Sequence, residues 1–313
     1  MDLKHTAFLF PGQGSQVVGM GGDLAHAFPE ARDVFSEADE VLGASISQII
    51  WEGPESELND TVNTQPALMV HSIAALRVCQ RSLSDSVPAF TAGHSMGELS
   101  ALVAAEVFPF AEGLKLARRR GEVMKMAGEI APGGMAAILG LEISVLEQVC
   151  AQASLPGEIV QVANDNCPGQ VVISGARSAL ERALVGAKQA GARRAVPLAV
   201  SIAAHSPLMI PAQQGFNRAL DGLTMADQAH PVIGNVSAAP LASIDAIRSD
   251  LRAQLTSRVR WTETIQYLVA QDVTTFVEIG SGSVLTNLLK RINPEVQGIS
   301  LGTPSDFDTL FKQ

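Results

Sequence analysis

The residues best suited to chemistry in this sequence form a short glycine-flanked motif, Gly93-His94-Ser95-Met96-Gly97. A serine in the pattern G-x-S-x-G sits on a sharp turn between a strand and a helix, which presents its hydroxyl as a nucleophile. The two glycines remove side-chain clashes at such a turn. A serine at the start of a helix also commonly caps that helix, so the motif alone leaves both interpretations open.

A nucleophilic serine needs an adjacent base, because a free hydroxyl is barely ionised at neutral pH. The sequence offers six histidines, namely His5, His26, His71, His94, His205 and His230. His94 adjoins the serine but would point elsewhere on a sharp turn, so we expect it to line an acyl pocket or to pack. His205 is the better candidate, since Pro207 prevents a helix there and makes the loop rigid. A structural role for this loop histidine stays open at this point.

The base also needs a partner that orients its ring. Asp165 is the only aspartate between Ser95 and His205, so it fits the chain order of a hydrolase triad. It precedes Pro168 and Gly169, however, where Asn and Asp commonly form turns. We therefore expect a backbone carbonyl, and not Asp165, to fix the imidazole tautomer.

A second glycine-rich segment follows the first predicted strand, with the sequence FPGQGSQ at residues 10–16. It matches neither a Walker loop nor the G-x-G-x-x-G pattern, so a phosphate site is weakly supported. In the other interpretation, the N–H groups of Gln13 and Met96 form an oxyanion hole, the pair of donors that stabilises a tetrahedral intermediate.

Three consecutive arginines, Arg118, Arg119 and Arg120, lie on an otherwise apolar helical segment. Consecutive helical residues point about 100° apart, so at most one or two of these side chains can face the interior. The set can form a solvated basic face. Alternatively, one guanidinium lies inside and grips a substrate carboxylate with two hydrogen bonds.

Composition excludes several classes of function. The chain has 313 residues, with 32 acidic against 22 basic residues and a net charge of -10, which argues against a nucleic-acid partner. The first apolar run is too short for a signal peptide or a membrane span, so we expect a cytoplasmic protein without a membrane partner. Cys79, Cys150 and Cys167 form no C-x-x-C pair, which fits isolated thiols in a reducing compartment. No metal or redox cofactor is implied.

Two patterns of elements run along the chain and predict an α/β fold. The first predicts a parallel sheet flanked by helices. Its elements are strands at 6–10, 89–92 and 276–279 and helices at 65–80, 96–105, 209–220 and 283–290. The second has the order βαββαβ, typical of a ferredoxin-like domain. Its elements are strands at 136–139, 158–164, 170–174 and 194–198 and helices at 144–152 and 178–190. We therefore predict a catalytic domain at 1–131 and 198–313 with an insertion at 132–197.

An ordered set of motifs extends nearly end to end. FPGQGSQ at 10–16, TQPAL at 64–68, GHSMGE at 93–98, the arginine before Gly121, SPL-M after His205 and EIGSGSVLTNLLKRI at 278–292 follow one another. The chain thereby resembles the malonyl-CoA:acyl carrier protein transacylases of fatty-acid synthesis and the related acyltransferase domains of polyketide synthases. The resemblance implies an α/β-hydrolase-like core with a parallel sheet and an inserted ferredoxin-like small domain.

The same resemblance implies ping-pong acyl transfer without a cofactor. Ser95 takes the malonyl group from malonyl-CoA with His205 as base, and the phosphopantetheine thiol of acyl carrier protein then accepts it. Gln13 and Met96 supply the oxyanion donors. Arg120 matches the family arginine that grips the malonyl carboxylate, which leaves Arg118 and Arg119 at the surface.

We expect four further residues to line the acyl pocket: His94, Gln65, Ala204 and Asn166. Ala204 stands where relatives often have Ser or Phe, so the pocket edge is small enough for slightly bulkier acyl groups. Some relatives have a glutamine before a tryptophan in the strand whose carbonyl orients the histidine, whereas this chain has Arg260-Trp261. We expect a monomer. The alternatives are a trans-acting polyketide-synthase acyltransferase, an acyl-thioester hydrolase or a catalytically silent carrier-binding scaffold.

Overall fold

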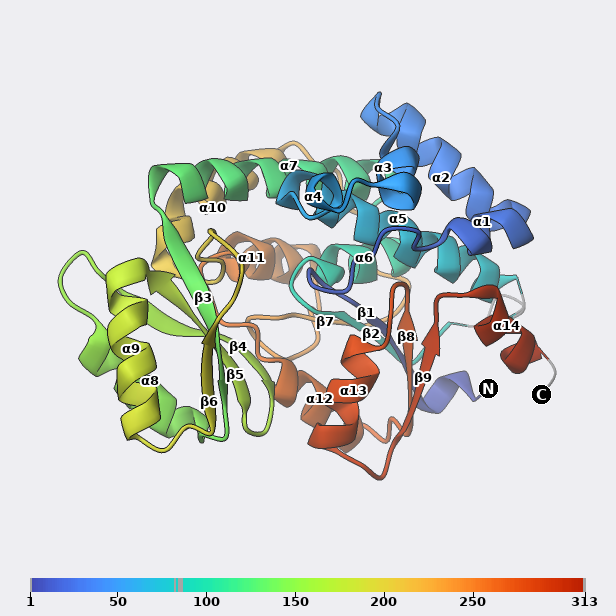
Figure 1. Cartoon of the computed structure of the whole chain (residues 1–313). Coiled ribbons are helices and arrows are strands. Elements are labelled where there is room, and N and C mark those ends of the chain that lie inside the picture. The colour runs from blue at the N-terminus through green and yellow to red at the C-terminus, as the bar shows by residue number, and fades with distance from the viewer. Residues whose placement is uncertain (1, 82, 84–86, 312–313) are drawn as a thin grey trace.

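Two β-sheets organise the chain, and Figure 1 shows them side by side. The computed structural model describes residues 2–81, 83 and 87–311, and within them the larger sheet has five parallel strands in the order β7-β2-β1-β8-β9. The strands are β1 (Thr6–Phe10), β2 (Phe90–Gly93), β7 (Val232–Ile233), β8 (Thr275–Ile279) and β9 (Gln297–Leu301). β1 lies in the middle of this sheet, between β2 and β8.

The sequence of β1 explains its central place. All five residues are buried, as expected for a strand covered on both faces of a parallel sheet. Side chains alternate between the two faces. Phe8 and Phe10 belong to the large hydrophobic cluster on one face, whereas Ala7 and Leu9 belong to a second cluster on the other.

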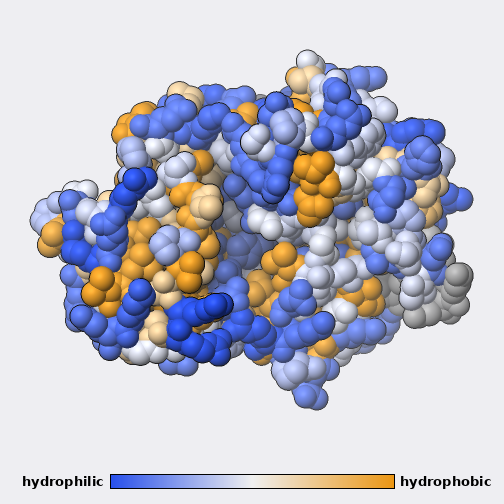
Figure 2. All heavy atoms as spheres, in the orientation of Figure 1, coloured by the Kyte–Doolittle hydropathy of each residue, from blue (hydrophilic) through white to orange (hydrophobic). Residues whose placement is uncertain are grey.

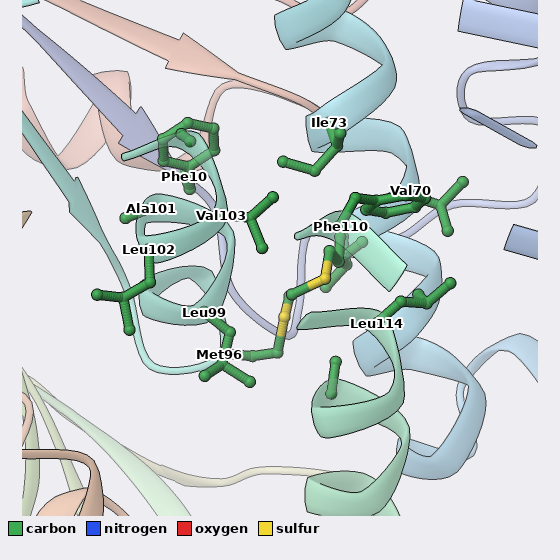
Figure 3. Close-up of a cluster of buried hydrophobic side chains, with 14 of the residues drawn as sticks. Phe10, Val70, Ile73, Met96, Leu99, Ala101, Leu102, Val103, Phe110 and Leu114 are labelled. Atoms are coloured by element: carbon green, nitrogen blue, oxygen red, sulfur yellow. The ribbon is translucent and has the colours of Figure 1, made fainter. Parts of the chain in front are cut away.

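Helices cover both faces of this sheet. The large cluster is built mainly from α1 (Gly22–Ala27), α2 (Pro29–Leu42), α3 (Ile46–Glu52), α5 (Thr61–Gln80), α6 (Gly97–Ala104), α7 (Phe110–Ile130), α10 (Ile210–Asp221) and α11 (Ile244–Gln254). Figure 3 shows part of it, with Met96 beside Leu99 and Leu114. The opposite face is covered by α12 (Trp261–Ala270) and α13 (Val284–Ile292). The other helices outside the smaller sheet are η1 (Leu3–His5), α4 (Glu55–Leu58), η2 (Pro207–Met209) and α14 (Pro304–Phe311).

The smaller sheet is antiparallel and lies within the segment predicted as an insertion. Its order is β4-β5-β3-β6, formed by β3 (Gly133–Leu139), β4 (Val160–Cys167), β5 (Gln170–Ala176) and β6 (Arg194–Pro197). Helices α8 (Ile143–Ala153) and α9 (Arg177–Gln189) pack on it around a separate hydrophobic cluster. The succession βαββαβ confirms the predicted fold class. The division into domains at residues 131 and 198 stays a prediction. Figure 2 shows a hollow in the surface where the two parts meet.

Several predicted elements have different ends in the structure. The helix predicted at 65–80 begins at Thr61, because the side chain of Asp60 accepts a hydrogen bond from the Val62 N–H and caps it. The strand before Ser95, predicted at 89–92, is Phe90–Gly93. The helix after it, predicted at 96–105, is Gly97–Ala104. The sequence patterns did not predict β7, which has two residues and depends on pairing with β2.

Close backbone contacts explain the glycines of the turn between β2 and α6. A Cβ atom on Gly97 would lie 2.1 Å from the Phe10 carbonyl oxygen, and one on Gly93 would lie 2.0 Å from the Gly97 backbone. A Cβ on Gly12 would lie 2.3 Å from the His94 carbonyl oxygen. The loop after β1 and the turn after β2 therefore touch through backbone atoms, and only glycine allows this approach.

We predict that Gly97→Ala lowers the free energy of unfolding by about 3 kcal/mol, because the backbone must shift to relieve the overlap with Phe10. Gly222→Ala is the matched control, since its Cβ would lie 3.8 Å from its nearest neighbour, the Ala219 oxygen, and its φ is negative. We expect the control to change stability by less than about 0.5 kcal/mol. Urea unfolding of both variants measures the difference, and equal stabilities would show that the contact is not limiting.

Candidate active site

Ser95 lies at the carboxyl edge of the parallel sheet, directly after β2. Its φ is +52°, a left-handed conformation that costs a non-glycine residue roughly 1–3 kcal/mol. Asn235, after β7, holds this conformation from both sides. Its Oδ1 accepts from the Ser95 N–H at 2.7 Å, and its Nδ2 donates to the Gly93 carbonyl at 2.7 Å. The turn therefore has the geometry of a nucleophile elbow and not of an ordinary helix cap.

His205 lies in the loop that returns from the smaller sheet, and its ring reaches Ser95. Its Nε2 lies 2.8 Å from the Ser95 Oγ. Its Nδ1 lies 2.9 Å from the Gln254 carbonyl oxygen and 3.1 Å from that of Ser257. Because carbonyl oxygens only accept hydrogen bonds, Nδ1 must carry the proton and Nε2 presents its lone pair to the serine. The arrangement can remove the proton from the Ser95 hydroxyl.

The environment keeps the His205 imidazole neutral. His205 is 2% exposed. Burial, and then the nearby charge of Arg120, lower the pKa of His205 to about 3. A neutral imidazole is the form that acts as a base.

Arg120 lies beside the nucleophile and is 1% exposed. Its Nη2 lies 3.1 Å from the Ser95 Oγ, and its Nη1 donates to the Gln65 Oε1 at 2.9 Å. Its Nε and Nη2 donate to the Gln254 Oε1 at 3.2 and 2.9 Å. Burial lowers the pKa of Arg120 to about 10, so the guanidinium is still cationic at neutral pH. All the partners of its hydrogen bonds are neutral groups.

The nearest carboxyl group does not offset this charge with a hydrogen bond. Glu98 is fully buried, and its Oε2 accepts from the Gln254 Nε2. Burial, and then the nearby Asp250, raise the pKa of Glu98 well above its usual range, which favours the uncharged acid. The site can therefore bind an anionic group next to the Ser95 hydroxyl.

The two other arginines lie nearer the surface, as expected. Arg118 is half-buried and donates to the Asn63 Oδ1 at 2.9 Å. Arg119 is half-buried and pairs with Glu122 at 3.0 Å.

The two backbone amides that are predicted to form an oxyanion hole lie in segments that touch each other. Met96 precedes α6, and Gln13 lies in the loop that contacts the His94 carbonyl through Gly12. Neither N–H has a hydrogen-bond partner within the described part of the chain. The side chain of Gln13 turns elsewhere, since its Oε1 accepts from the Thr61 Oγ1 at 3.1 Å.

The four residues predicted to line the acyl pocket lie next to three different parts of the site. Gln65 holds the Arg120 guanidinium directly. The Nε2 of His94 lies 2.9 Å from the Asn166 Oδ1, and its ring packs edge-on against Trp261. Ala204 is half-buried and adjoins His205 in the chain.

Two expectations about the neighbourhood of the base need correction. Asp165 lies within β4 and not in a turn, which falls instead at Pro168 and Gly169. Its Oδ1 accepts from the Thr262 Oγ1 at 2.8 Å, and the His205 Nδ1 bonds backbone carbonyls, as expected. Arg260, the residue before Trp261, is the N-cap of α12 and does not lie in a strand. The carbonyls that bind the His205 ring are those of Gln254 and Ser257.

The sequence interpretation missed Gln254, Ser257 and Asn235. Gln254 contacts Arg120, His205 and the Ser95 carbonyl, to which its Nε2 donates at 3.0 Å. No local pattern marks these residues, because Gln254 and Ser95 lie 159 positions apart in the chain.

Among the residues that the structure describes, no group of three or more His, Cys, Asp or Glu side chains could hold a metal ion. No helix in the described ranges is long and apolar enough to cross a membrane.

We predict that the reactivity of Ser95 toward phenylmethylsulfonyl fluoride persists at pH 5. This reagent modifies activated serines without needing the natural substrate. A base with a pKa near 6.5 would lose about 30-fold of its neutral form at pH 5, whereas a pKa of about 3 leaves His205 neutral. Labelling rates followed by mass spectrometry from pH 5 to 8 test this, and a steep fall below pH 6.5 would contradict it. Folding stability, in contrast, falls in acid, because His205 gains a proton below pH 6.5 in the unfolded state but stays neutral in the folded state.

Comparison with known proteins places this geometry in a family. Residues 7–302 match the acyl transferase domain model. The chain is 46% identical over 306 residues to the malonyl CoA-acyl carrier protein transacylase of Bacillus subtilis, covering 98% of this chain and 96% of the relative. It is 43% identical over 303 residues to that of Escherichia coli K12, covering 97% of each chain.

Solved structures agree over the same length. The malonyl-CoA:acyl carrier protein transacylase of Xanthomonas oryzae pv. oryzae superposes with a TM-score of 0.95 at 41% identity, over 100% of this chain and 99% of that one. A malonyl-transacylase in complex with its type II polyketide synthase acyl carrier protein gives a TM-score of 0.94 at 42% identity, over 98% and 99%. The chain therefore belongs to the acyl transferase domain family.

Proposed function

We propose that this protein transfers a malonyl group from malonyl-CoA to the phosphopantetheine thiol of acyl carrier protein in fatty-acid synthesis, by way of an ester on Ser95. The observation that carries the proposal is the cationic guanidinium of Arg120, buried among neutral partners at 3.1 Å from the nucleophile. The names of the relatives supply the acyl group and the carrier.

In the first half-reaction the Ser95 Oγ attacks the thioester carbonyl while the His205 Nε2 takes its proton. The tetrahedral oxyanion accepts hydrogen bonds from the N–H groups of Met96 and Gln13. The intermediate collapses, the C–S bond breaks, and the protonated imidazole returns its proton to the departing CoA thiolate. In the second half-reaction the His205 Nε2 takes the proton of the carrier thiol, whose sulfur attacks the ester carbonyl. The C–O bond to Ser95 then breaks, and the Ser95 Oγ receives that proton. These steps move protons and an acyl group, so they need no cofactor.

Arg120 supplies the choice of acyl group. Its guanidinium can hold the malonyl carboxylate with two parallel hydrogen bonds, as arginine commonly does. An acetyl group would leave the buried charge without an anionic partner, which strongly disfavours acetyl-CoA as a substrate.

The three cysteines are free and buried, in keeping with the proposed cytoplasmic location.

The alternative chemistry is hydrolysis of the acyl-serine ester. The Arg120 clamp argues against hydrolysis as the main reaction, because a site that selects malonyl groups fits an enzyme that transfers malonyl groups to an acceptor. The complex of a relative with a polyketide carrier makes a polyketide carrier the second candidate acceptor.

We predict that brief exposure to malonyl-CoA adds one malonyl group to the protein and that Ser95→Ala prevents the addition. Intact-protein mass spectrometry measures the adduct. Addition of holo acyl carrier protein should discharge it faster than water does. A discharge rate that does not change with carrier would show that the protein is a hydrolase.

We predict that Arg120→Ala lowers kcat/KM for malonyl-CoA by about 100-fold or more, because the carboxylate then lacks its charged partner. The acylation rate with acetyl-CoA should rise relative to malonyl-CoA. Arg119→Ala is the matched control, since this arginine lies one residue away and pairs with Glu122 near the surface. An unchanged preference for malonyl-CoA in Arg120→Ala would place the selectivity elsewhere.

A further inference from the structure

One side chain of the smaller sheet reaches the loop that carries the base. Gln161 lies on β4, one of the two edge strands of that sheet, which Figure 1 shows on the side facing α12. Its Nε2 donates to the His205 carbonyl oxygen at 2.8 Å and to the Thr256 carbonyl oxygen at 3.1 Å. A single amide group therefore joins two loops that lie 44 and 95 positions along the chain from Gln161.

These two loops together determine where the imidazole lies. His205 has a φ of +59°, a left-handed conformation that a residue other than glycine rarely adopts unless its surroundings hold it. Thr256 lies between Gln254 and Ser257, whose carbonyl oxygens bind the His205 Nδ1. The Gln161 amide thus connects the main chain of the base to the segment that orients its ring.

No other hydrogen bond holds the His205 main chain within the described residues. The ring itself is held through Nδ1 and Nε2, so its position depends on the two loops keeping their spacing. A tilt of the imidazole that displaces Nε2 by a fraction of an ångström would weaken its 2.8 Å contact with the Ser95 Oγ.

The rest of β4 anchors the carbonyl-bearing segment independently of Gln161. The Asp165 N–H donates to the Val259 carbonyl at 3.0 Å, and the Val259 N–H donates to the Ala163 carbonyl at 2.8 Å. Thr262 adds the side-chain bond to Asp165 at 2.8 Å. Loss of Gln161 would therefore free the His205 loop while the smaller sheet stays attached.

We propose that Gln161 is a positioning residue that fixes the base, by tying the left-handed His205 main chain to the loop whose carbonyls orient its ring. The inference rests on the proposed Ser95–His205 chemistry but not on which acyl group is transferred. It gives the smaller sheet a direct part in the geometry of the nucleophile and base.

The test compares Gln161→Leu, which has no donor, with Gln161→Glu, which keeps the shape but carries a carboxylate that cannot donate at neutral pH. Thr262→Val is the matched control, because it removes another side-chain bond between β4 and the larger part of the chain. The main readout is the rate of Ser95 labelling by phenylmethylsulfonyl fluoride at pH 7.5. The second is the ¹⁵N spectrum of the His205 ring, which reports its tautomer. Thermal unfolding shows that each variant is folded during the measurement.

We expect both Gln161 variants to label at least about tenfold more slowly than the original protein, a part of the 100- to 10,000-fold that a positioned base contributes. The His205 spectrum should change from one tautomer to a mixture. In steady-state assays with malonyl-CoA, kcat should fall while KM changes little, because the Arg120 clamp is untouched. Thr262→Val should label at a rate within about twofold of the original.

Three results would overturn the inference. The first is labelling of either folded Gln161 variant at the original rate with an unchanged His205 spectrum. The second is an equal loss in Thr262→Val, which would assign the effect to attachment of the sheet. The third is no labelling of Ser95 in the original protein, which would remove the nucleophile and base themselves. Labelling by the sulfonyl fluoride without a malonyl adduct would overturn the proposed substrate alone.

Discussion

A positive charge buried without a carboxylate partner is the constraint on which the rest of this active site depends. Arg120 keeps its charge because burial lowers its pKa only to about 10, and neutral oxygens of Gln65 and Gln254 accept hydrogen bonds from its N–H groups. The same charge helps to keep His205 neutral, since a second cation close by is unfavourable. Glu98, a buried acidic group near Arg120, is favoured in its uncharged form. The proposed selectivity for an anion and the proposed role of His205 as base thus share one electrostatic origin.

Gln254 connects these functions within a single residue at the end of α11. Its Oε1 accepts from Arg120, its Nε2 donates to the Ser95 carbonyl, and its own carbonyl accepts from His205. A displacement of this residue would therefore disturb the clamp, the elbow and the base together. Such shared partners make the effects of substitutions in this region strongly non-additive.

Local patterns in the sequence were sufficient to predict the turn that carries Ser95 and much of the fold. The glycines beside Ser95 and the apolar run of β1 carry their geometry within a few residues, as do the alternating elements of the smaller sheet. The partners of His205 and Arg120 could not be predicted in this way. Gln254 and Asn235 act across more than a hundred positions, and only the packed sheet brings them to Ser95. The resemblance directed attention to the residue before Trp261, whereas the carbonyls that bind the His205 ring come from Gln254 and Ser257.

The central position of β1 has a consequence for how the chain is made. One edge of β1 (Thr6–Phe10) pairs with β8, which is synthesised 265 or more positions later in the chain. Until Thr275–Ile279 emerges, the nascent sheet has an open hydrophobic edge, the kind of surface through which chains associate wrongly. Completion of the sheet, and with it the loop after β1 that touches the elbow, therefore waits for β8. Truncation before Thr275 would leave β1 as an edge strand, because the strands on one side of it would be lost.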